Sequence, residues 1–276
     1  MLPNSVPVTR DNPPVPTFRA IRSTRAFEEV AAQIREELAK GTLKVGNRLP
    51  SERALSEQFG VSRNTLREAL RSLEHAGLVR LQKGASGGAF ITEGSGEAIT
   101  TGLLDLYHVG SIKPTDLTEA RIWLESIIVR EACQRATPAD LQELHQNIKD
   151  AEDATEQRDF SRRAEVHLNF HRILARMTGN PIMVIVMDGV LSVLRHYIES
   201  IGEYENAFVL PSRKRFMKFM EVPDAEGAVA EMEASLKRLQ RSYLSHAKQV
   251  ALAGAAEAAA PLAKAQPKPR AARKPL

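Results

Sequence analysis

Residues 46–70 read GNRLPSERALSEQFGVSRNTLREAL, and they carry the strongest structural signals in the chain. Ser51 and Ser62 each stand directly before a run with helical spacing. Serine is a preferred helix N-cap because its hydroxyl accepts a hydrogen bond from a free backbone N–H. Gly60 separates the two runs, since glycine tolerates the backbone conformation that ends a helix. The stretch therefore predicts two short helices, 51–59 and 62–76, joined by a tight turn: a helix-turn-helix.

The second predicted helix has two chemically different sides. Its apolar side chains share one arc: Leu66, Ala69, Leu70 and Leu73. A polar stripe occupies the adjoining arc: Arg63, Asn64, Arg67 and Arg71. Arginine can donate two parallel hydrogen bonds to the edge of guanine, and asparagine can pair similarly with adenine. The stripe favours a helix that reads the DNA major groove, with an ordinary solvated face as the alternative.

Flanking segments complete a winged helix-turn-helix over residues 21–92. Helical spacing over residues 27–38 precedes the two helices, and two strand-like segments, 78–81 and 89–91, follow them. The loop between the strands is rich in glycine and begins at Lys83, so its backbone can approach a phosphate or a minor groove closely. A plain surface turn is the alternative. Residues 1–20 are expected to form a disordered leader.

From residue 97 onward the chain shows helical spacing and almost no strand signal. The expected helices are 97–109, 114–136, 138–157, 160–178, 181–204, 211–221 and 224–249. Beyond residue 250 the composition is dominated by Ala, Pro, Lys and Arg. The sequence therefore predicts a mainly α protein: an N-terminal winged helix-turn-helix, a C-terminal all-α helical bundle for effector binding and dimerisation at residues 97–250, and a disordered basic tail at residues 251–276.

Charge and composition narrow the functional class. Residues 21–91 carry 12 Lys and Arg against 8 Asp and Glu, whereas residues 92–263 carry 19 against 25. The basic front favours a polyanionic partner, although uneven surface charge explains the same numbers. No apolar run approaches the roughly 20 residues of a membrane span, and the N-terminus has no signal core. Cys133 is the single cysteine, which excludes an internal disulfide. These features predict a cytoplasmic protein without membrane association.

The front half resembles the GntR-type bacterial regulators. The resemblance rests on Gly46–Ser56, Phe59–Leu70, Leu73–Val79 and Gly87–Ile91. It implies a homodimer on pseudo-palindromic, double-stranded operator DNA. The implied DNA contacts are Arg53, Ser62, Arg63, Asn64, Thr65 and Arg67 on the helices, and Lys83 and Gly84 at the tip of the wing.

The back half resembles the C-terminal domain of the FadR-like (FCD) branch, a helical bundle that binds a small effector. The resemblance is carried by Leu117–Arg121 with Leu124 and Glu125, by Phe170–His171 with Gly179–Pro181, and by Asp224–Ala228. Most members hold a divalent metal through an aspartate four residues before the histidine and two later histidines. Here His167 replaces the aspartate, and the later positions fall near Arg213 and Ser235. Two imidazoles beside a cation make a poor metal site, so we predict no metal and no other cofactor.

The same positions favour a cationic pocket. We expect Arg121, His167, His171 and Arg213 to converge on an anionic effector such as an organic acid. The alternative is that the two histidines are satisfied core residues and that Arg121 forms a salt bridge with Glu125 at i+4. The aromatic residues expected in the core are Trp123, Phe160, Phe170 and Phe208.

Three functions fit the sequence to different degrees. It favours a sequence-specific transcriptional regulator, a repressor whose operator affinity a small anionic metabolite modulates, and no enzymatic activity. A metal-dependent enzyme or metal-sensing regulator built on His167 and His171 is the alternative. No glutamate lies between them as a zinc protease requires, and no third ligand has suitable spacing. A purely architectural DNA binder is the third, but a basic tail alone gives only non-specific affinity.

Overall fold

The computed structural model describes residues 24–84, 87–202 and 206–264. The chain divides into two compact units, residues 1–93 and 94–276, and each is described by itself. The leader expected at residues 1–20 and residues 265–276 of the expected tail lie outside the described residues.

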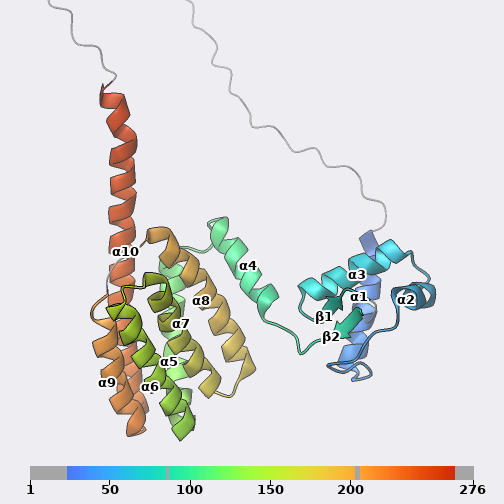
Figure 1. The fold of residues 1–276 in the computed structure, drawn as a ribbon, viewed down its shortest axis with the longest axis horizontal. Helices are drawn as coiled ribbons and strands as arrows, with labels where there is room; N and C mark the ends of the chain where they lie inside the picture. Colours follow the sequence, from blue (N-terminus) through green and yellow to red (C-terminus); the bar gives the residue numbers. More distant parts are fainter. Residues whose placement is uncertain (1–23, 85–86, 203–205, 265–276) are drawn as a thin grey trace, which may run out of the picture. The chain divides into compact units, whose positions relative to one another are not determined.

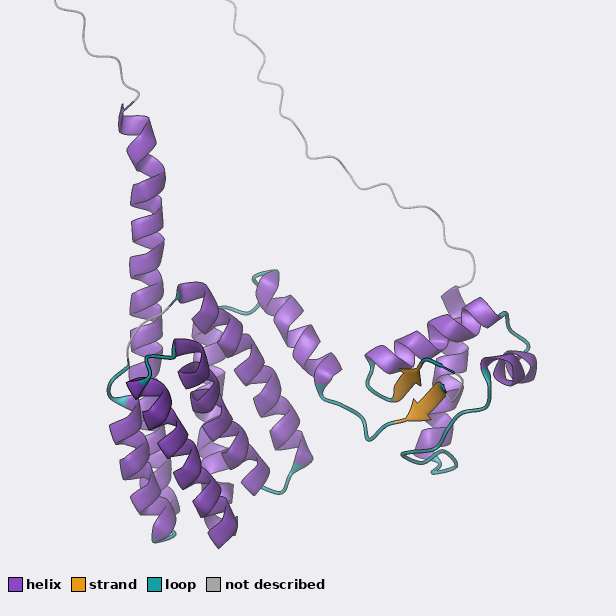
Figure 2. Cartoon of the chain, viewed as in Figure 1, coloured by secondary structure: helices purple, strands orange, loops and turns teal. Residues whose placement is uncertain are grey.

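The first unit combines three helices with a β-hairpin (Figures 1 and 2). It contains α1 (Thr24–Ala39), α2 (Glu52–Phe59), α3 (Arg63–His75), β1 (Val79–Gln82) and β2 (Gly88–Ile91). The strands pair antiparallel, from Val79 opposite Ile91 to Gln82 opposite Gly88. The buried apolar core draws on the helices and both strands: Val30, Ile34, Leu49, Leu66, Leu70, Leu73, Val79 and Ile91. The winged helix-turn-helix fold is therefore confirmed.

The second unit is built from helices, as Figure 2 shows for the described residues. They are α4 (Glu97–His108), α5 (Pro114–Arg135), α6 (Pro138–Glu156), α7 (Phe160–Met177), α8 (Pro181–Ile201), α9 (Val209–Glu221) and α10 (Ala225–Lys264). α5 packs against α10, α7 and α8, and α6 packs against α7 and α9. The large side chains of this core are fully buried, among them Phe170, Phe216, Leu191 and Leu194. The predicted all-α bundle is confirmed.

Local signals set the starts of several of these helices. Proline occupies the first turn of α5, α6 and α8, where its missing N–H has no intrahelical partner to lose. Thr137 and Asp140 form a reciprocal capping box at the start of α6, with N–H···O distances of 3.2 and 2.9 Å. The helix boundaries therefore follow from nearby residues, much as the sequence predicts.

Two expectations about the second unit are wrong. The chain does not lose regular structure at residue 251, because α10 continues to Lys264; this segment is rich in alanine, which has the highest helix propensity. Trp123 is not a core residue, since it is 63% exposed. Ile122 and Glu125 of α5 face inward, and the helical phase turns Trp123 away from them. Phe170 is buried, and Phe160 and Phe208 pack partly buried against the core, as expected.

One helix, α8, is long and apolar enough to cross a membrane when judged by length and composition alone. A core helix of a folded bundle passes the same test. The side chains of Met187, Leu191 and Leu194 on α8 are fully buried inside the bundle. The apolar character of α8 is therefore accounted for by packing.

Candidate functional site

The first candidate surface is the start of α3. The Ser62 hydroxyl accepts a hydrogen bond from the Thr65 backbone N–H at 3.1 Å and lies 2.9 Å from the Thr65 hydroxyl. Gly60, at φ 63°, makes the left-handed turn that separates α2 from α3. The capping role of Ser62 is confirmed, and the turn brings the first residues of α3 to the surface of the unit.

The two sides of α3 are arranged as the sequence predicts. Leu66, Ala69, Leu70 and Leu73 are buried. The polar stripe is exposed along its whole length: Arg63, Asn64, Arg67 and Arg71. Thr65 is half-buried beside its cap. Four side chains able to pair with base edges or phosphates therefore lie on one accessible strip of the helix.

Carboxylates from α2 hold two of the predicted DNA-contacting arginines. The Arg67 Nε donates to Glu52 Oε2 at 2.8 Å, and the Arg53 Nε donates to Glu57 Oε1 at 3.0 Å. Both pairs engage the Nε and leave the terminal nitrogens of the guanidinium for other partners. Within the described residues, no carboxylate forms an ion pair with Arg63. These exposed pairs contribute little to stability, and they orient the arginines.

The wing is anchored to the segment before α2. The Leu49 N–H donates to the Ala89 carbonyl at 2.8 Å, the Ile91 N–H donates to the Asn47 carbonyl at 2.9 Å, and Arg48 donates to the Gly87 carbonyl. A Cβ atom at Gly87 would lie 2.4 Å from the Gln82 carbonyl oxygen, so the hairpin closes this tightly only around glycine. Lys83 and Gly84 lie exposed at the start of the wing loop.

The second candidate site is a cavity of about 230 Å³ inside the helical unit. Side chains of α5, α7, α9 and α10 line it, and most of its wall is apolar, including Leu168, Phe216 and Leu239. The four residues predicted to converge all line this cavity: Arg121, His167, His171 and Arg213. Helices distant in sequence thus bring the predicted set together.

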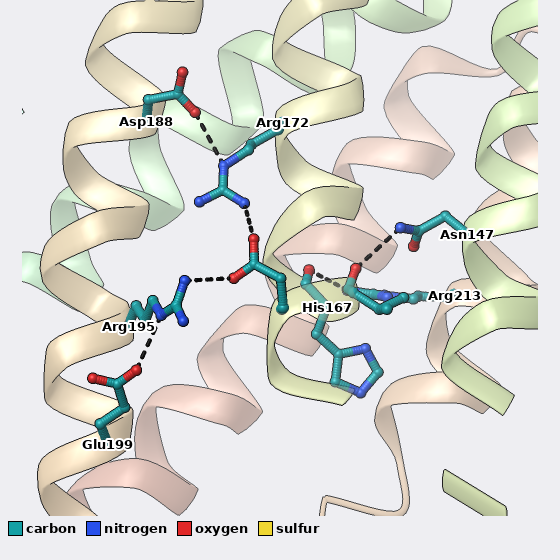
Figure 3. Close-up of polar contacts among 9 residues, drawn as sticks. Asn147, His167, Arg172, Asp188, Arg195, Glu199 and Arg213 are labelled. Atoms are coloured by element: carbon teal, nitrogen blue, oxygen red, sulfur yellow. Dashed lines mark hydrogen bonds and ion pairs between the residues drawn. The ribbon is translucent and has the colours of Figure 1, made fainter. Parts of the chain in front are cut away.

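Arg213 is a buried cation with an unused donor. Its Nη2 donates to the His167 carbonyl at 2.7 Å, a contact visible in Figure 3, and its guanidinium carbon lies 4.2 Å from the centre of the Phe170 ring. Its Nη1 is buried without a hydrogen-bond partner among the described residues. Burial lowers the pKa of Arg213 to about 9, so the side chain stays protonated at neutral pH.

Glu125, which sequence reasoning treated only as a partner for Arg121, joins α5 to α7. It is fully buried, and its Oε1 lies 3.5 Å from Arg121 Nε and 2.6 Å from His171 Nδ1. Burial disfavours its ionised form, but His171 and Arg121 outweigh that effect and hold its pKa below the usual value. The i+4 spacing predicted the contact between Glu125 and Arg121, whereas nothing in the sequence indicated the contact between Glu125 and His171.

The two histidines are neutral at neutral pH. Burial lowers the pKa of His171 to about 4 in spite of Glu125. Burial, followed by the charges of Arg213 and Arg163, drives the pKa of His167 well below its ordinary value. The His167 Nδ1 is buried without a hydrogen-bond partner among the described residues. His167 is therefore not a satisfied core histidine.

The residues around the cavity do not fit the divalent metal that the FCD resemblance implies. No group of three or more His, Cys, Asp or Glu side chains that could hold a metal ion occurs in the described part of the chain. A protonated guanidinium, Arg213, shares the cavity wall with the two imidazoles, and its charge would repel a cation. The positive charge of this site comes from arginine.

A charged network joins α7 to α8 on one flank of the cavity. Glu165 accepts from Arg172 at 2.7 Å and from Arg195 at 3.0 Å; Arg172 also pairs with Asp188, and Arg195 with Glu199 (Figure 3). A second hollow of about 220 Å³ opens beside Glu165 and Arg195. It shares the apolar side chains of Phe160, Leu168 and Ile198 with the main cavity. The network therefore ties α7 to α8 beside the second hollow.

A winged helix-turn-helix followed by a helical domain with a buried cationic cavity defines a DNA-binding transcriptional regulator with a ligand-binding domain. Residues 26–90 match the family described as bacterial regulatory proteins, gntR family, and residues 116–238 match the FCD domain. The chain belongs to the gntR family of bacterial regulatory proteins and carries an FCD domain.

Individual relatives agree with this assignment. The Uxu operon regulator of Haemophilus influenzae is 33% identical over 160 residues, which cover 58% of this chain and 57% of that protein. The HTH-type transcriptional repressor NanR of Edwardsiella tarda is 31% identical over 181 residues, 64% of this chain and 67% of that protein. A solved structure of a Streptococcus agalactiae GntR protein has a TM-score of 0.60 at 26% identity, covering 78% of this chain and 99% of that one.

Proposed function

We propose that this regulator is a repressor whose affinity for operator DNA changes when a small organic anion binds the cavity of the helical unit. The relative from Edwardsiella tarda is named a transcriptional repressor, which supports the sign of regulation. We assign no catalytic role to His167 or His171. The regulator acts in the cytoplasm, where bacterial DNA lies.

The DNA contacts of the proposal lie on α2, α3 and the wing. Arg63, Asn64 and Arg67 contact base edges in the major groove, and Arg53 contacts the phosphate backbone of the DNA. The start of α3, with Ser62 and Thr65, offers free backbone amides to a phosphate. Lys83 and Gly84 at the wing reach the minor groove. The exposure of the α3 stripe and its distance from the apolar core support these roles.

The observation that carries the effector part is the unpaired charge of Arg213. Of the charged groups buried at the cavity, Arg121 is balanced by Glu125, but no described carboxylate forms an ion pair with Arg213. Glu231, which also lines the cavity, pairs with Arg215 at 2.8 Å. A buried charge is costly unless it is paired, so the cavity is suited to one carboxylate.

We also propose that the chain acts as a homodimer, because a two-fold protein matches a pseudo-palindromic operator. Trp123 and Ile127 lie one turn apart on α5 and are 63% and 49% exposed, which suits a face covered by a second copy. Sedimentation of Trp123→Glu should show monomers, with Lys149→Glu on exposed α6 surface as the control. An unchanged dimer would place the interface elsewhere.

The test of the regulatory function uses the full chain. The wild-type protein first selects its preferred DNA duplexes from a random-sequence library, and these duplexes serve as the operator. Fluorescence anisotropy then measures the affinity of the protein for this operator with and without each of a panel of small carboxylates. We expect one or more carboxylates to change operator affinity, since an effector must bind one arrangement of the protein better than the other. Selection of no preferred sequence would refute sequence-specific binding, and indifference to every carboxylate would refute the effector assignment.

A further inference from the structure

The polar stripe of α3 continues beyond the residues proposed to contact base edges. Arg71 lies on this stripe, one turn beyond Arg67 and two turns beyond Arg63. Each residue advances an α-helix by about 1.5 Å, so Arg71 lies about 12 Å from Arg63 along the helix axis. The DNA major groove is itself about 12 Å wide. When the start of α3 contacts base edges, a residue at this distance therefore lies nearer the rim of the groove than its floor.

The wing is attached to the far end of the same stripe. Glu74, which lies three residues after Arg71 on the same side of α3, accepts a hydrogen bond at 2.8 Å from the backbone N–H of Leu81. Leu81 belongs to β1, the strand that leads to the wing loop, and α3 packs against β1. Arg71 therefore lies between the start of α3 and the wing.

The charge of Arg71 is not compensated within the unit. Its side chain is exposed, and no carboxylate of the described residues forms an ion pair with it. The nearby carboxylate of Glu74 accepts from the Leu81 N–H instead. Arg67 differs, because Glu52 accepts a hydrogen bond from its Nε at 2.8 Å. Arg71 therefore presents a positive charge at the surface, and such a charge is attracted to DNA phosphates.

We infer that Arg71 contacts the DNA phosphate strand that runs between the major groove occupied by α3 and the minor groove occupied by the wing. In a duplex, one sugar-phosphate strand separates each major groove from the minor groove beside it. A protein with one element in each of the two grooves must span that strand. This inference rests on the proposed DNA-binding function, and it adds a contact that fixes the position of the unit on the duplex and carries no base preference.

The first experiment measures how the affinity for DNA depends on salt. Fluorescence anisotropy with the full chain follows binding to the operator selected by the wild type and to a scrambled duplex over a series of salt concentrations. Each phosphate contact contributes about 0.9 to the slope of log affinity against log salt concentration. Arg71→Ala should therefore reduce this slope by about 1 and weaken binding about tenfold at roughly 0.1 M salt. Both duplexes should lose affinity by the same factor, because their phosphates are alike.

Arg35→Ala is the matched control for the loss of charge. Arg35 is an exposed arginine of the same unit, and it lies on α1, outside the helix-turn-helix and the wing. Its removal should leave the salt slope unchanged. An unchanged slope in Arg71→Ala, or an equal reduction in Arg35→Ala, would overturn the inference. If the wild type itself did not prefer the operator to the scrambled duplex, the proposed function would fail instead.

The second experiment separates a phosphate contact from a base contact. A lysine ammonium pairs with a phosphate as a point charge, but it lacks the planar fork with which arginine pairs with guanine. Arg71→Lys should therefore keep most of the affinity and the salt slope of the wild type. Arg67→Lys, in contrast, should discriminate less well between the operator and the scrambled duplex. A comparable loss of discrimination in Arg71→Lys would mean that Arg71 contacts bases, and it would overturn the inference.

Discussion

Arg213→Met should leave the protein at least as stable as the wild type while removing its response to carboxylates. The pKa of the guanidinium falls from 12.5 to about 9 in the folded chain. At about 1.36 kcal/mol per unit, keeping it charged inside the bundle costs on the order of 5 kcal/mol. Methionine removes that cost and fills similar apolar space. The variant loses the hydrogen bond from Arg213 to the His167 carbonyl, which contributes roughly 2 kcal/mol, and the contact of the guanidinium with the Phe170 ring, which contributes about 2 kcal/mol.

The expected net change is therefore between zero and about 2 kcal/mol of added stability. Urea unfolding at pH 7, followed by helical circular dichroism, measures it, and Lys214→Met, an exposed position next on α9, serves as the control. Ligand-induced changes in melting temperature give the second readout. A loss of more than about 3 kcal/mol would mean that Arg213 is a structural residue. A normal response to carboxylates in the variant would mean that the anion binds elsewhere.

Three further perturbations test the remaining parts of the site. Arg63→Ala and Arg67→Ala should each weaken operator binding by about 1–3 kcal/mol and relax base preference, and wild-type affinities for both operator and scrambled DNA would contradict the assignment of α3. Gly87→Ala should open the wing, because its Cβ would meet the Gln82 carbonyl oxygen at 2.4 Å. Fluorescence anisotropy should then show weaker DNA binding, and unaltered binding would rule out a role for the closed hairpin. Stability should fall as pH drops from 7 to 5, since the pKa of His171 is about 4 in the folded chain and about 6.5 in the unfolded chain, so the unfolded chain takes up the proton first. The contribution of this group is fully present above about pH 6.5 and reduced by about 2 kcal/mol at pH 5. His171→Asn should lessen this loss, and an equal loss in the variant would refute it.

Local signals in the sequence were enough to predict the helices of the first unit, including α3, the helix that we propose reads DNA. Ser51, Ser62 and Gly60 act on backbone groups within a few residues, so the starts and ends of α2 and α3 can be predicted without any tertiary contact. The same holds for the prolines that begin α5, α6 and α8. The exposed stripe of α3 follows from helical phase alone, because the arc of leucines must be buried and fixes where the arginines point.

Which side chains meet at the cavity depended on tertiary packing. The sequence placed Glu125 next to Arg121 along one helix, but the contact with His171 arises from the packing of α5 against α7. Trp123 shows the same limit, since its apolar character predicted burial and the phase of α5 turned it outward. Spacing along a helix reports neighbours on that helix, whereas the charge balance of the cavity depends on side chains that other helices bring close together.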